Sequence, residues 1–325
     1  MKLLITGGAG YIGSHMVRYA QEYGHEVIVL DDFSTGHLKM VKGCEIHNVN
    51  LLDQEKLSLL LKDRYFDGVI HLAAKSLVEE SIKKPKLYYS NNVIGSLNLV
   101  KEMISNGVSN LVFSSTAAIF GNPVTHKIAE DHPKNPINPY GKSKLIVENI
   151  LENICLAYDF NVTCLRYFNA AGAHESGEIG EDRNPETHLI PNVLKSVIEK
   201  KIGLEVFGKN YNTIDGTCVR DYVHVTDLAQ AHLLSYEYMT KKKGFSSFNL
   251  GNGDGFSVLD IIKGCEKVVE SRISYKYKSR RDGDPAILVA DSSKAIKELG
   301  WKPKFSKLET ILKSAWRWHT TKNIN

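Results

Sequence analysis

The chain has few of the features that mark membrane, disulfide-rich or nucleic-acid-binding proteins. Its 325 residues contain no apolar run near the ~18 residues that a membrane helix needs. The five cysteines form no CxxC pair and are odd in number, which argues against a disulfide framework or a zinc site and favours a reducing cytoplasm. Lysine and arginine are spread along the chain, and a net charge of +4 suits an anionic small molecule better than a nucleic acid. We therefore expect no metal, no nucleic acid and no membrane partner.

The first half of the chain alternates between two kinds of segment. Short apolar runs rich in β-branched residues, which are typical of buried parallel strands, lie at 2–6, 26–30, 67–74, 110–115 and 162–167. Longer amphipathic segments lie between them, at about 12–23, 54–62, 85–106 and 139–158. This alternation predicts an α/β fold with a Rossmann-type doubly wound parallel sheet.

The pattern changes after residue 169. Residues 170–191 are rich in glycine, proline and charge and show no clear periodicity, and a loop this long in a compact domain is usually functional. The elements expected beyond it are helices near 189–200, 226–240, 257–270 and 305–318 and strands at 204–208 and 248–251. We expect a first domain of residues 1–170, joined by about 221–250, and a smaller α/β substrate-binding domain within 171–325.

A glycine-rich turn follows the first predicted strand and opens the first predicted helix. The segment TGGAGYIG places Gly7, Gly10 and Gly13 at regular three-residue spacing. Residues without Cβ let backbone N–H groups approach a pyrophosphate, which then lies at the N-terminus of a helix. Tight turns also use glycine, so the spacing alone is weak evidence for dinucleotide binding. The predicted strand before this segment and the predicted helix after it favour a dinucleotide site.

Two acids, Asp31 and Asp32, follow directly on the second predicted strand. A carboxylate there accepts hydrogen bonds from the adenosine ribose and repels a 2′-phosphate. The pattern therefore predicts NAD rather than NADP as the cofactor. We expect Asp31 to bind the ribose, whereas Asp32 has the alternative of being a solvated loop residue.

The segment PYGKSK places Tyr140 and Lys144 one helical turn apart at the start of a predicted helix. A free phenol has a pKa of about 10, so it needs nearby positive charge to act as a base near neutral pH. On these residues alone, a surface helix with an unpaired lysine is the better interpretation. The hydroxyls of Ser114, Ser115 and Thr116 end a predicted strand at the edge where α/β proteins bind ligands, which favours a proton-transfer site.

These motifs resemble the extended short-chain dehydrogenase/reductase family, and within it the UDP-sugar 4-epimerases. The resemblance runs from Lys2 to about Trp301, nearly the whole chain, and YGKSK is shared by many relatives. The resemblance also includes the segments TGGAGYIGSH, YYSNNVIGSLNL, LRYFNAAGAHESGEIGED, VRDYVHVTDLA and ADSSKAIKELGW, of which the RYFN…GAHESGEIGED and VRDYVHV matches are much narrower.

The resemblance implies that the chain interconverts UDP-galactose and UDP-glucose with tightly bound NAD, by transient oxidation at C4, rotation of the keto-sugar and return of the hydrogen. Tyr140 would take the proton of the sugar 4-hydroxyl. Lys144 would lower the pKa of Tyr140 and hold the nicotinamide ribose. Thr116 would supply the hydroxyl for which many relatives use serine.

The resemblance also implies two sets of binding residues. The cofactor set is Gly7, Gly10, Tyr11, Ile12, Gly13, Asp31, Asp32, Asn50, Leu51, Leu72, Ala73, Ala74, Asn92, Ser114, Tyr140, Lys144 and Tyr167. The UDP-sugar set is Thr116, Tyr140, Asn169, His188, Leu189, Phe207, Arg220, Tyr222, Arg281, Asp284 and Leu288. Two arginines suit a diphosphate, although each alone could instead form a surface ion pair.

Three positions depart from the family pattern. Asn50 stands where relatives often carry an aspartate facing the adenine, and His188 stands where some carry asparagine. Leu288 occupies a position that borders the sugar and is intermediate in size, so N-acetylated UDP-sugars are possible additional substrates.

Other functions stay open at this point. A 4-epimerase of a pentose or uronic acid nucleotide and a dehydrogenase with exchangeable NAD share the motifs, while a non-catalytic NAD-binding sensor would be expected to lose Tyr140 or Lys144. Ala117 and Ala118 after Thr116 argue against a 4,6-dehydratase, which carries an acid pair there.

Relatives also suggest a homodimer formed through helices near 85–106 and 139–158.

Overall fold

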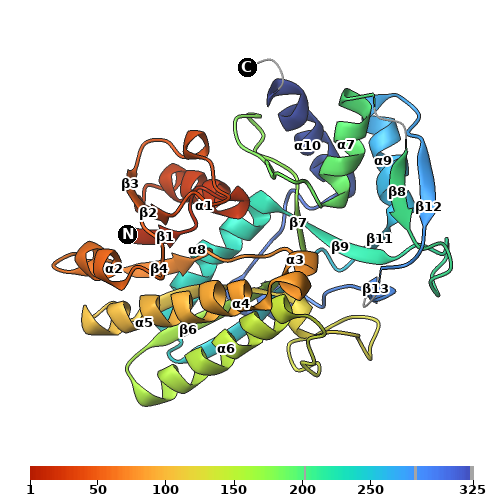
Figure 1. The fold of residues 1–325 in the computed structure, drawn as a ribbon. Helices are drawn as coiled ribbons and strands as arrows, with labels where there is room; N and C mark the ends of the chain where they lie inside the picture. Colours follow the sequence, from red (N-terminus) through yellow and green to blue (C-terminus); the bar gives the residue numbers. More distant parts are fainter. Residues whose placement is uncertain (201–202, 282–283, 323–325) are drawn as a thin grey trace.

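The computed structural model describes residues 1–200, 203–281 and 284–322 (Figure 1). Its centre is a seven-stranded sheet in which every neighbouring pair is parallel. The strand order is β10 (Phe245–Leu250), β6 (Asn161–Tyr167), β5 (Asn110–Thr116), β4 (Gly68–His71), β1 (Lys2–Thr6), β2 (Glu26–Asp31) and β3 (Glu45–Asn48). The order reverses between β1 and β4, and this switch point is where doubly wound sheets bind ligands. The predicted fold class is confirmed.

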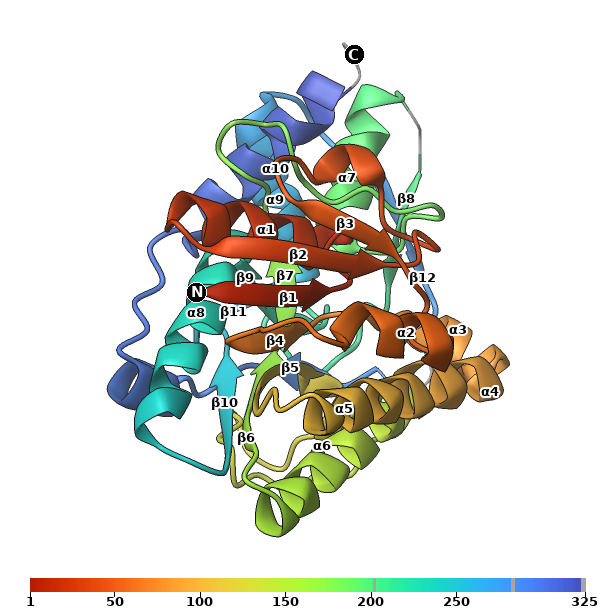
Figure 2. The same ribbon diagram turned by 90° about the vertical axis from the view of Figure 1, so that its left-hand side faces the viewer.

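Helices cover both faces of this sheet (Figures 1 and 2). One face carries α1 (Tyr11–Glu22) and α8 (Val225–Lys241); the other carries α2 (Gln54–Leu61), α5 (Gly95–Ser105) and α6 (Pro139–Ala157). Strand β1 shows why both faces are sealed, because successive side chains point to opposite sides of a sheet. Leu3 and Ile5 join the core on the α1 side, and Leu4 joins the core on the α5 side, all fully buried.

Several shorter elements lie between β4 and α5. They are α3 (Val78–Lys83), α4 (Pro85–Tyr88) and a π-helical stretch, Tyr89–Ile94, that runs into α5. Two 3-10 turns lie at Leu38–Met40 and Ala117–Ile119. The single helix predicted at 85–106 is therefore α4, a widened turn and α5 in succession, and hydrophobic spacing does not separate these from one continuous helix.

The rest of the chain forms a smaller α/β portion at one end of the sheet (Figure 1). Its helices are α7 (Leu189–Ile198), α9 (Val258–Val269) and α10 (Leu308–Lys322). A π-helical turn at Ala295–Leu299 returns to the main sheet, where it packs against α8 and β10. Its strands are β11 (Gly255–Ser257), β9 (Val219–His224) and β13 (Ile287–Leu288), with β7 (Asn169–Ala171) paired to β9, and the separate pair β8 (Leu204–Phe207) and β12 (Tyr275–Lys278). The core of this portion is built from α7, α9 and α10.

Predicted and observed elements differ at the edges of the main sheet and in the smaller portion, where strands β7, β9, β11, β12 and β13 were not predicted because they are short or interrupted by polar and charged residues. The strand predicted at 67–74 ends at His71, because the next residues leave the sheet to form part of a cleft. Edge strand β3 was missed, because its sequence EIHN is half exposed and has no apolar run. The strand predicted at 248–251 begins at Phe245, and the helix predicted at 305–318 begins at Leu308. Among the described helices, none combines the length and hydropathy required to cross a bilayer.

Candidate active site

The loop between β1 and α1 has glycine where any side chain would collide with the backbone. Gly7 has φ +71°, and a Cβ on it would lie 2.6 Å from the backbone nitrogen of Ala73. A Cβ on Gly13 would lie 2.0 Å from the carbonyl oxygen of Gly7. Gly10 caps α1 without any side-chain hydrogen bond, so the first N–H groups of the helix are left for another partner. This loop is shaped to receive a phosphate at a helix N-terminus.

The two acids after β2 have different partners. Asp31 is buried and accepts hydrogen bonds from the N–H groups of Ala9 (2.9 Å) and Phe33 (2.8 Å). Burial raises the pKa of Asp31, although these two backbone bonds oppose the effect. Asp32 accepts hydrogen bonds from Asn50 Nδ2 at 2.7 Å and from a backbone N–H. Asp32 thus has a hydrogen-bond partner in Asn50, and its role at the ribose stays a prediction.

An open cleft lies over this loop and the ends of β1, β2 and β4. Its lining includes the predicted residues Gly7, Gly10, Asp31, Asp32, Asn50, Leu51, Ala73 and Ala74, together with Leu30, Ser34, Thr35, Val49, Lys75 and Asn91, which the sequence did not single out. A glycine cradle at one end and two carboxylates at the other suit the pyrophosphate and the ribose of NAD, and the carboxylates disfavour a 2′-phosphate. The residues present therefore fit the predicted cofactor.

Other predicted cofactor residues hold the walls of this cleft. Asn92 is buried; its Oδ1 accepts from the N–H of Lys75 (2.9 Å), and its Nδ2 donates to Ser143 Oγ (3.0 Å) on α6. The phenol of Tyr11 donates to the carbonyl oxygen of Gly172 at 2.6 Å. Asn92 thus ties the loop after β4 to α6, and Tyr11 ties the glycine loop to the loop after β7. The remaining members, Ile12 and Leu72, are half-buried and pack against the core on the α1 side.

The start of α6 brings Tyr140 against the end of β5. Asn138 caps the helix by accepting from the N–H of Gly141 at 2.8 Å, and Pro139 takes the first helical position, where it is well tolerated. A Cβ on Gly141 would lie 2.4 Å from the carbonyl oxygen of Ala118. Helix α6 therefore begins in close contact with the turn that follows Thr116, at the carboxyl edge of the sheet.

The phenol of Tyr140 experiences opposing influences. Burial raises its pKa, while a hydrogen bond with Thr116 and the charge of Arg183 lower it. The net direction is upward, so the phenol is held as the neutral acid in the absence of further positive charge. The predicted partnership of Tyr140 with the hydroxyl of Thr116 matches this geometry.

Lys144 lies beneath the site and is buried. Its Nζ donates to the carbonyl oxygen of Ser114 at 2.7 Å and lies 4.7 Å from the centre of the Phe113 ring. Burial lowers the pKa of Lys144 to about 7. The hydroxyl of Ser114 in turn accepts from the phenol of Tyr167. The predicted effect of Lys144 on the pKa of Tyr140 stays a prediction, because burial, Thr116 and Arg183 are the causes that shift this pKa here.

The predicted UDP-sugar residues fall into two groups in the smaller portion. Arg220 on β9 forms an ion pair with Asp284, and the guanidinium carbon of Arg281 lies over the Phe207 ring, 4.0 Å from its centre. Arg281 is exposed and the Arg220 side chain is 13% exposed, so both cations can reach a ligand. The structure thus collects two arginines from separate segments into one portion of the molecule.

The remaining predicted substrate residues lie on β7, β9, α7 and β13. Asn169 Nδ2 donates to the carbonyl oxygen of Asp221 at 2.9 Å, and Tyr222, its register partner on β9, is buried. Leu189 is the first residue of α7. Leu288 pairs in register with Arg220 and packs against the buried cluster of Ala117, Ile119, Phe120 and Ile128. Leu288 therefore lies between the diphosphate-binding candidates and the turn after Thr116.

The loop of residues 172–188 holds charged residues that the sequence did not single out. Glu181 is 5% exposed, accepts from Arg183 Nε at 2.7 Å and lies 2.6 Å from His188 Nδ1. Burial alone would raise the pKa of Glu181, but His188 and Arg183 lower it to about 2. The segment GEIGED contains Glu181 but gives no sign of its partners, and Arg183 lies in an aperiodic stretch.

Ligand atoms of Glu181, Glu186 and His188 lie within 4.8 Å of one another, a spacing that a metal ion could use. Both carboxylates already have cationic partners: Glu181 has Arg183, and Glu186 lies 3.2 Å from Lys195 Nζ. Ion pairing accounts for this cluster without a metal.

Comparison with known proteins agrees with this geometry. A family model described as the NAD dependent epimerase/dehydratase family matches residues 3–251. The UDP-glucose 4-epimerase of Halalkalibacterium halodurans is 48% identical over 319 residues, which cover 98% of this chain and 96% of the relative. The solved UDP-glucose 4-epimerase of Bifidobacterium longum in complex with NAD+ and UDP is 37% identical, with a TM-score of 0.95 and coverage of 99% of both chains. The UDP-Glc/GlcNAc 4-epimerase of Campylobacter jejuni is 39% identical, with a TM-score of 0.85 and coverage of 98% of this chain and 99% of that one. The chain therefore belongs to the NAD-dependent epimerase/dehydratase family, within its group of UDP-glucose 4-epimerases.

Proposed function

We propose that this chain interconverts UDP-galactose and UDP-glucose by transient oxidation at C4 of the sugar. The observation that carries this proposal is the position of the Tyr140 phenol: it partners Thr116 at the carboxyl edge of the sheet, the edge that the glycine loop and its cleft also occupy. The relatives named above are UDP-glucose 4-epimerases, which supports the same reaction.

NAD would be held by the glycine loop at its pyrophosphate and by Asp31 at its adenosine ribose. When bound, NAD supplies the redox chemistry, taking the hydrogen of C4 with its electron pair and giving it back. Lys75 and Asn50, which also line the cleft, add a cation and an amide to this set. Asn50 is hydrogen-bonded to Asp32, so these two side chains are already ordered where the adenosine of NAD would bind.

Tyr140 would carry the proton in both directions. As a phenolate it takes the proton of the sugar 4-hydroxyl, and the resulting phenol returns that proton to the same oxygen after the keto-sugar has turned. Thr116 has a hydroxyl that can both donate and accept, so it can bond the sugar oxygen and the phenol together. Because the same phenol takes the proton and later returns it, the reaction needs no separate acid and base.

Arg220 and Arg281 would anchor the diphosphate. Two guanidinium groups suit two phosphates, because each presents paired N–H donors. Asp284 keeps Arg220 in place through their ion pair, and the ring of Phe207 supports the guanidinium of Arg281.

The proposal also divides the chain into two parts. A domain of residues 1–170, joined by about 221–250, would bind NAD, and a portion within 171–325 would bind the UDP-sugar. The packing of α8 on α1 and of β10 in the main sheet supports it.

Leu288 makes UDP-GlcNAc and UDP-GalNAc candidate additional substrates, because its side chain is smaller than an aromatic one. The solved relative from Campylobacter jejuni is described as a UDP-Glc/GlcNAc 4-epimerase, which supports a substrate range within this group that includes N-acetylated UDP-sugars. Turnover of UDP-galactose with none of UDP-GalNAc would contradict this part. Epimerisation of pentose or uronic acid nucleotides is the alternative for the sugar.

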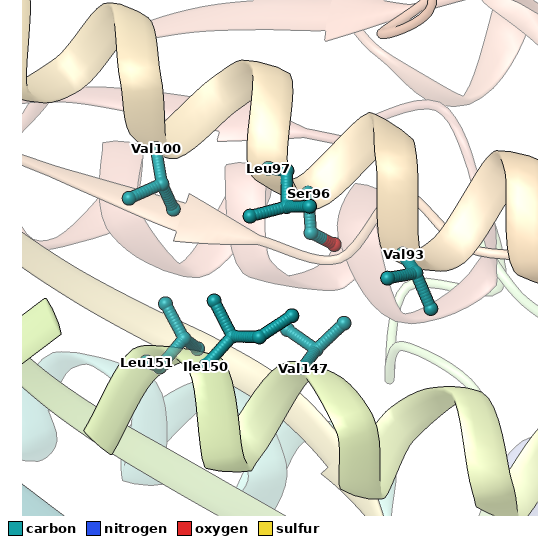
Figure 3. Close-up of a pocket in the computed structure, with 7 residues that line it drawn as sticks. All are labelled: Val93, Ser96, Leu97, Val100, Val147, Ile150 and Leu151. Carbon is teal, nitrogen blue, oxygen red and sulfur yellow. The ribbon is translucent and has the colours of Figure 1, made fainter. Parts of the chain in front are cut away.

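A homodimer through α4–α5 and α6 also belongs to the proposal. Apolar side chains are exposed on these helices: Leu87 is 38% exposed, Ile94 48%, Leu97 40% and Ile146 38%. Figure 3 shows side chains of α5 and α6 facing one another across a small apolar hollow at the same place. Light scattering of wild type and Leu97→Glu tests this, since a charge on the face should give a monomer.

The five free cysteines fit the expected cytoplasmic location, which cell fractionation would check.

The reaction itself has a direct test. Purified protein is incubated with UDP-galactose without added NAD, and the anomeric protons are followed by NMR. Formation of UDP-glucose supports the proposal. Accumulation of NADH would indicate a dehydrogenase instead, and no reaction would favour a sensor or a different sugar.

A further inference from the structure

We propose that the loop of residues 172–188 is a strap across the cofactor cleft, and that its residues Asp182 and Arg183 retain bound NAD by joining the two sides of the cleft. This inference rests on the proposed binding of NAD at the glycine loop. It gives a task to an aperiodic segment that otherwise only connects β7 to α7.

The order of the strands fixes where such a strap must run. In the main sheet β1 lies between β4 and β2, and both pairs are parallel, so the loops after these three strands leave the same edge of the sheet. The glycine loop follows β1 and therefore lies between the other two loops. A segment that contacts both outer loops has to cross the glycine loop, where the pyrophosphate of NAD would lie.

Asp182 makes the contact on the β2 side. Its carbonyl oxygen accepts a hydrogen bond from His37 Nε2 at 3.1 Å, and its carboxylate lies 3.9 Å from Lys39 Nζ. The backbone N–H of His37 donates to the carbonyl oxygen of Ala9 at 3.0 Å, which holds His37 against the glycine loop. Thr35, two residues earlier, lines the cleft. This end of the strap is therefore attached directly beside the glycine loop.

Arg183, the next residue, makes the contact on the β4 side. Its NH1 lies 3.5 Å from Ser76 Oγ, and its Nε donates to the buried carboxylate of Glu181 at 2.7 Å. Ser76 follows Lys75, which lines the cleft and itself donates to Ser34 Oγ, in the loop after β2, at 2.9 Å. Two successive residues of the strap thus reach opposite sides of the cleft, next to a second bridge between the same two loops.

The strap is also attached on the side away from these loops. Glu178 pairs with Arg18 of α1, and Trp318 Nε1 of α10 donates to the carbonyl oxygen of Glu181 at 3.0 Å. These attachments hold the strap in position over the edge of the sheet. The contacts with His37 and Ser76 are then the ones that have to break before the pyrophosphate can leave.

These contacts join protein to protein, and this gives the strap a distinctive kinetic effect. A side chain that binds NAD directly slows its release without slowing its entry. A strap closed by contacts within the chain slows entry and release alike, because it has to open for both. Retention suits the proposed reaction, since release of the reduced cofactor in mid-turnover would leave a keto-sugar that could not be converted back.

The test measures NAD exchange in the purified holoenzyme. The protein is incubated with an excess of isotope-labelled NAD, and the bound cofactor is analysed by mass spectrometry after gel filtration. The double variant His37→Ala/Ser76→Ala removes the contacts on both sides and leaves the strap itself unchanged. It should exchange NAD at least about tenfold faster than wild type, as expected for the loss of two hydrogen bonds that hold a closed state.

The association rate distinguishes a strap from a direct ligand contact. Measured by stopped-flow fluorescence on protein from which NAD has been removed, this rate should also rise in the double variant. His25→Ala is the matched control, because it removes the same kind of side chain from the amino end of β2, where His25 Nδ1 lies 3.3 Å from the N-terminal nitrogen. It should leave both rates unchanged.

Two results would overturn the inference while NAD binding stands. One is an unchanged exchange rate in the double variant, and the other is faster release with an unchanged association rate, which would mean that His37 or Ser76 binds NAD directly. A wild-type chain that binds no NAD at all would instead overturn the proposed function, and this inference with it.

Discussion

The glycine at position 7 offers a sharp test of how the cofactor loop is built, because the chain contains a matched control. Gly7 and Gly107 have the same φ of +71°. A Cβ at Gly7 would lie 2.6 Å from the backbone nitrogen of Ala73, whereas a Cβ at Gly107 would meet nothing within 4 Å. The two alanine variants therefore share the backbone strain, and only Gly7→Ala adds a collision.

The expected magnitudes follow from these two contributions. A non-glycine residue in the left-handed region costs about 1–2 kcal/mol, and this is the whole effect expected for Gly107→Ala. Forcing a methyl group into a closed contact adds about 1–3 kcal/mol, so Gly7→Ala should lose about 2–5 kcal/mol of stability. The contact in question joins the end of β1 to the loop after β4, so Gly7 and Ala73 must move apart, which changes the lining of the cleft, and NAD should be lost.

The assay separates these effects. Free energies of unfolding are measured in urea on protein from which NAD has been removed, because bound ligand would add its own stabilisation. The NAD content of each variant as purified is measured separately by an enzymatic assay. The reasoning is refuted if Gly7→Ala keeps wild-type NAD content and loses no more stability than Gly107→Ala.

Three further predictions concern the site and its support. Tyr140→Phe should keep NAD and UDP binding, checked by calorimetry, yet lose nearly all turnover; substantial residual activity would remove Tyr140 from proton transfer. Arg166→Met should lower the free energy of unfolding in urea by about 3–5 kcal/mol, because it leaves Glu148 buried and unpaired, while adding Glu148→Gln should recover part of the loss. Glu181 has a pKa of about 2 when folded, against about 4.3 when unfolded, so its contribution to stability is present above pH 4.3 and is lost as pH falls towards 2. Thermal unfolding of wild type and Glu181→Gln between pH 6 and 3 should therefore converge on the acid side, and parallel curves would contradict this.

Sequence patterns were sufficient for the parts of the fold that local physics determines. The buried parallel strands are continuous apolar runs, so β1, β2, β5 and β6 could be predicted within a residue or two. Edge strand β3 could not, because an edge strand has no need of apolar side chains on both faces. The π-helical stretch at Tyr89–Ile94 was also out of reach, since hydrophobic spacing changes little when one turn widens.

The site divides in the same way. The glycine loop and Asp31 were predictable because strand, turn, helix and acid follow one another closely in the chain. The spacing of Tyr140 and Lys144 indicated a shared helix face, but it could not show that burial lowers the pKa of Lys144 or that Ser114 engages its ammonium group. The partners of Glu181 and Arg183 were out of reach, because their contacts with His188 and Ser76 exist only once the loop is folded.

The two ends of the proposed substrate site differ in the way that a turning intermediate requires. At one end are Arg220 and Arg281, each held by a neighbour, so a diphosphate meets cations that are already in place. Near the sugar end, Leu288 packs beside Phe120 in an apolar cluster, which offers no hydrogen bond that would fix one face of the ring. Binding free energy is thereby concentrated on the UDP group, which does not react, and the keto-sugar can rotate about its phosphate linkage without breaking strong contacts. A polar side chain at Leu288 would oppose that rotation even if it improved substrate binding, because it would favour one of the two faces.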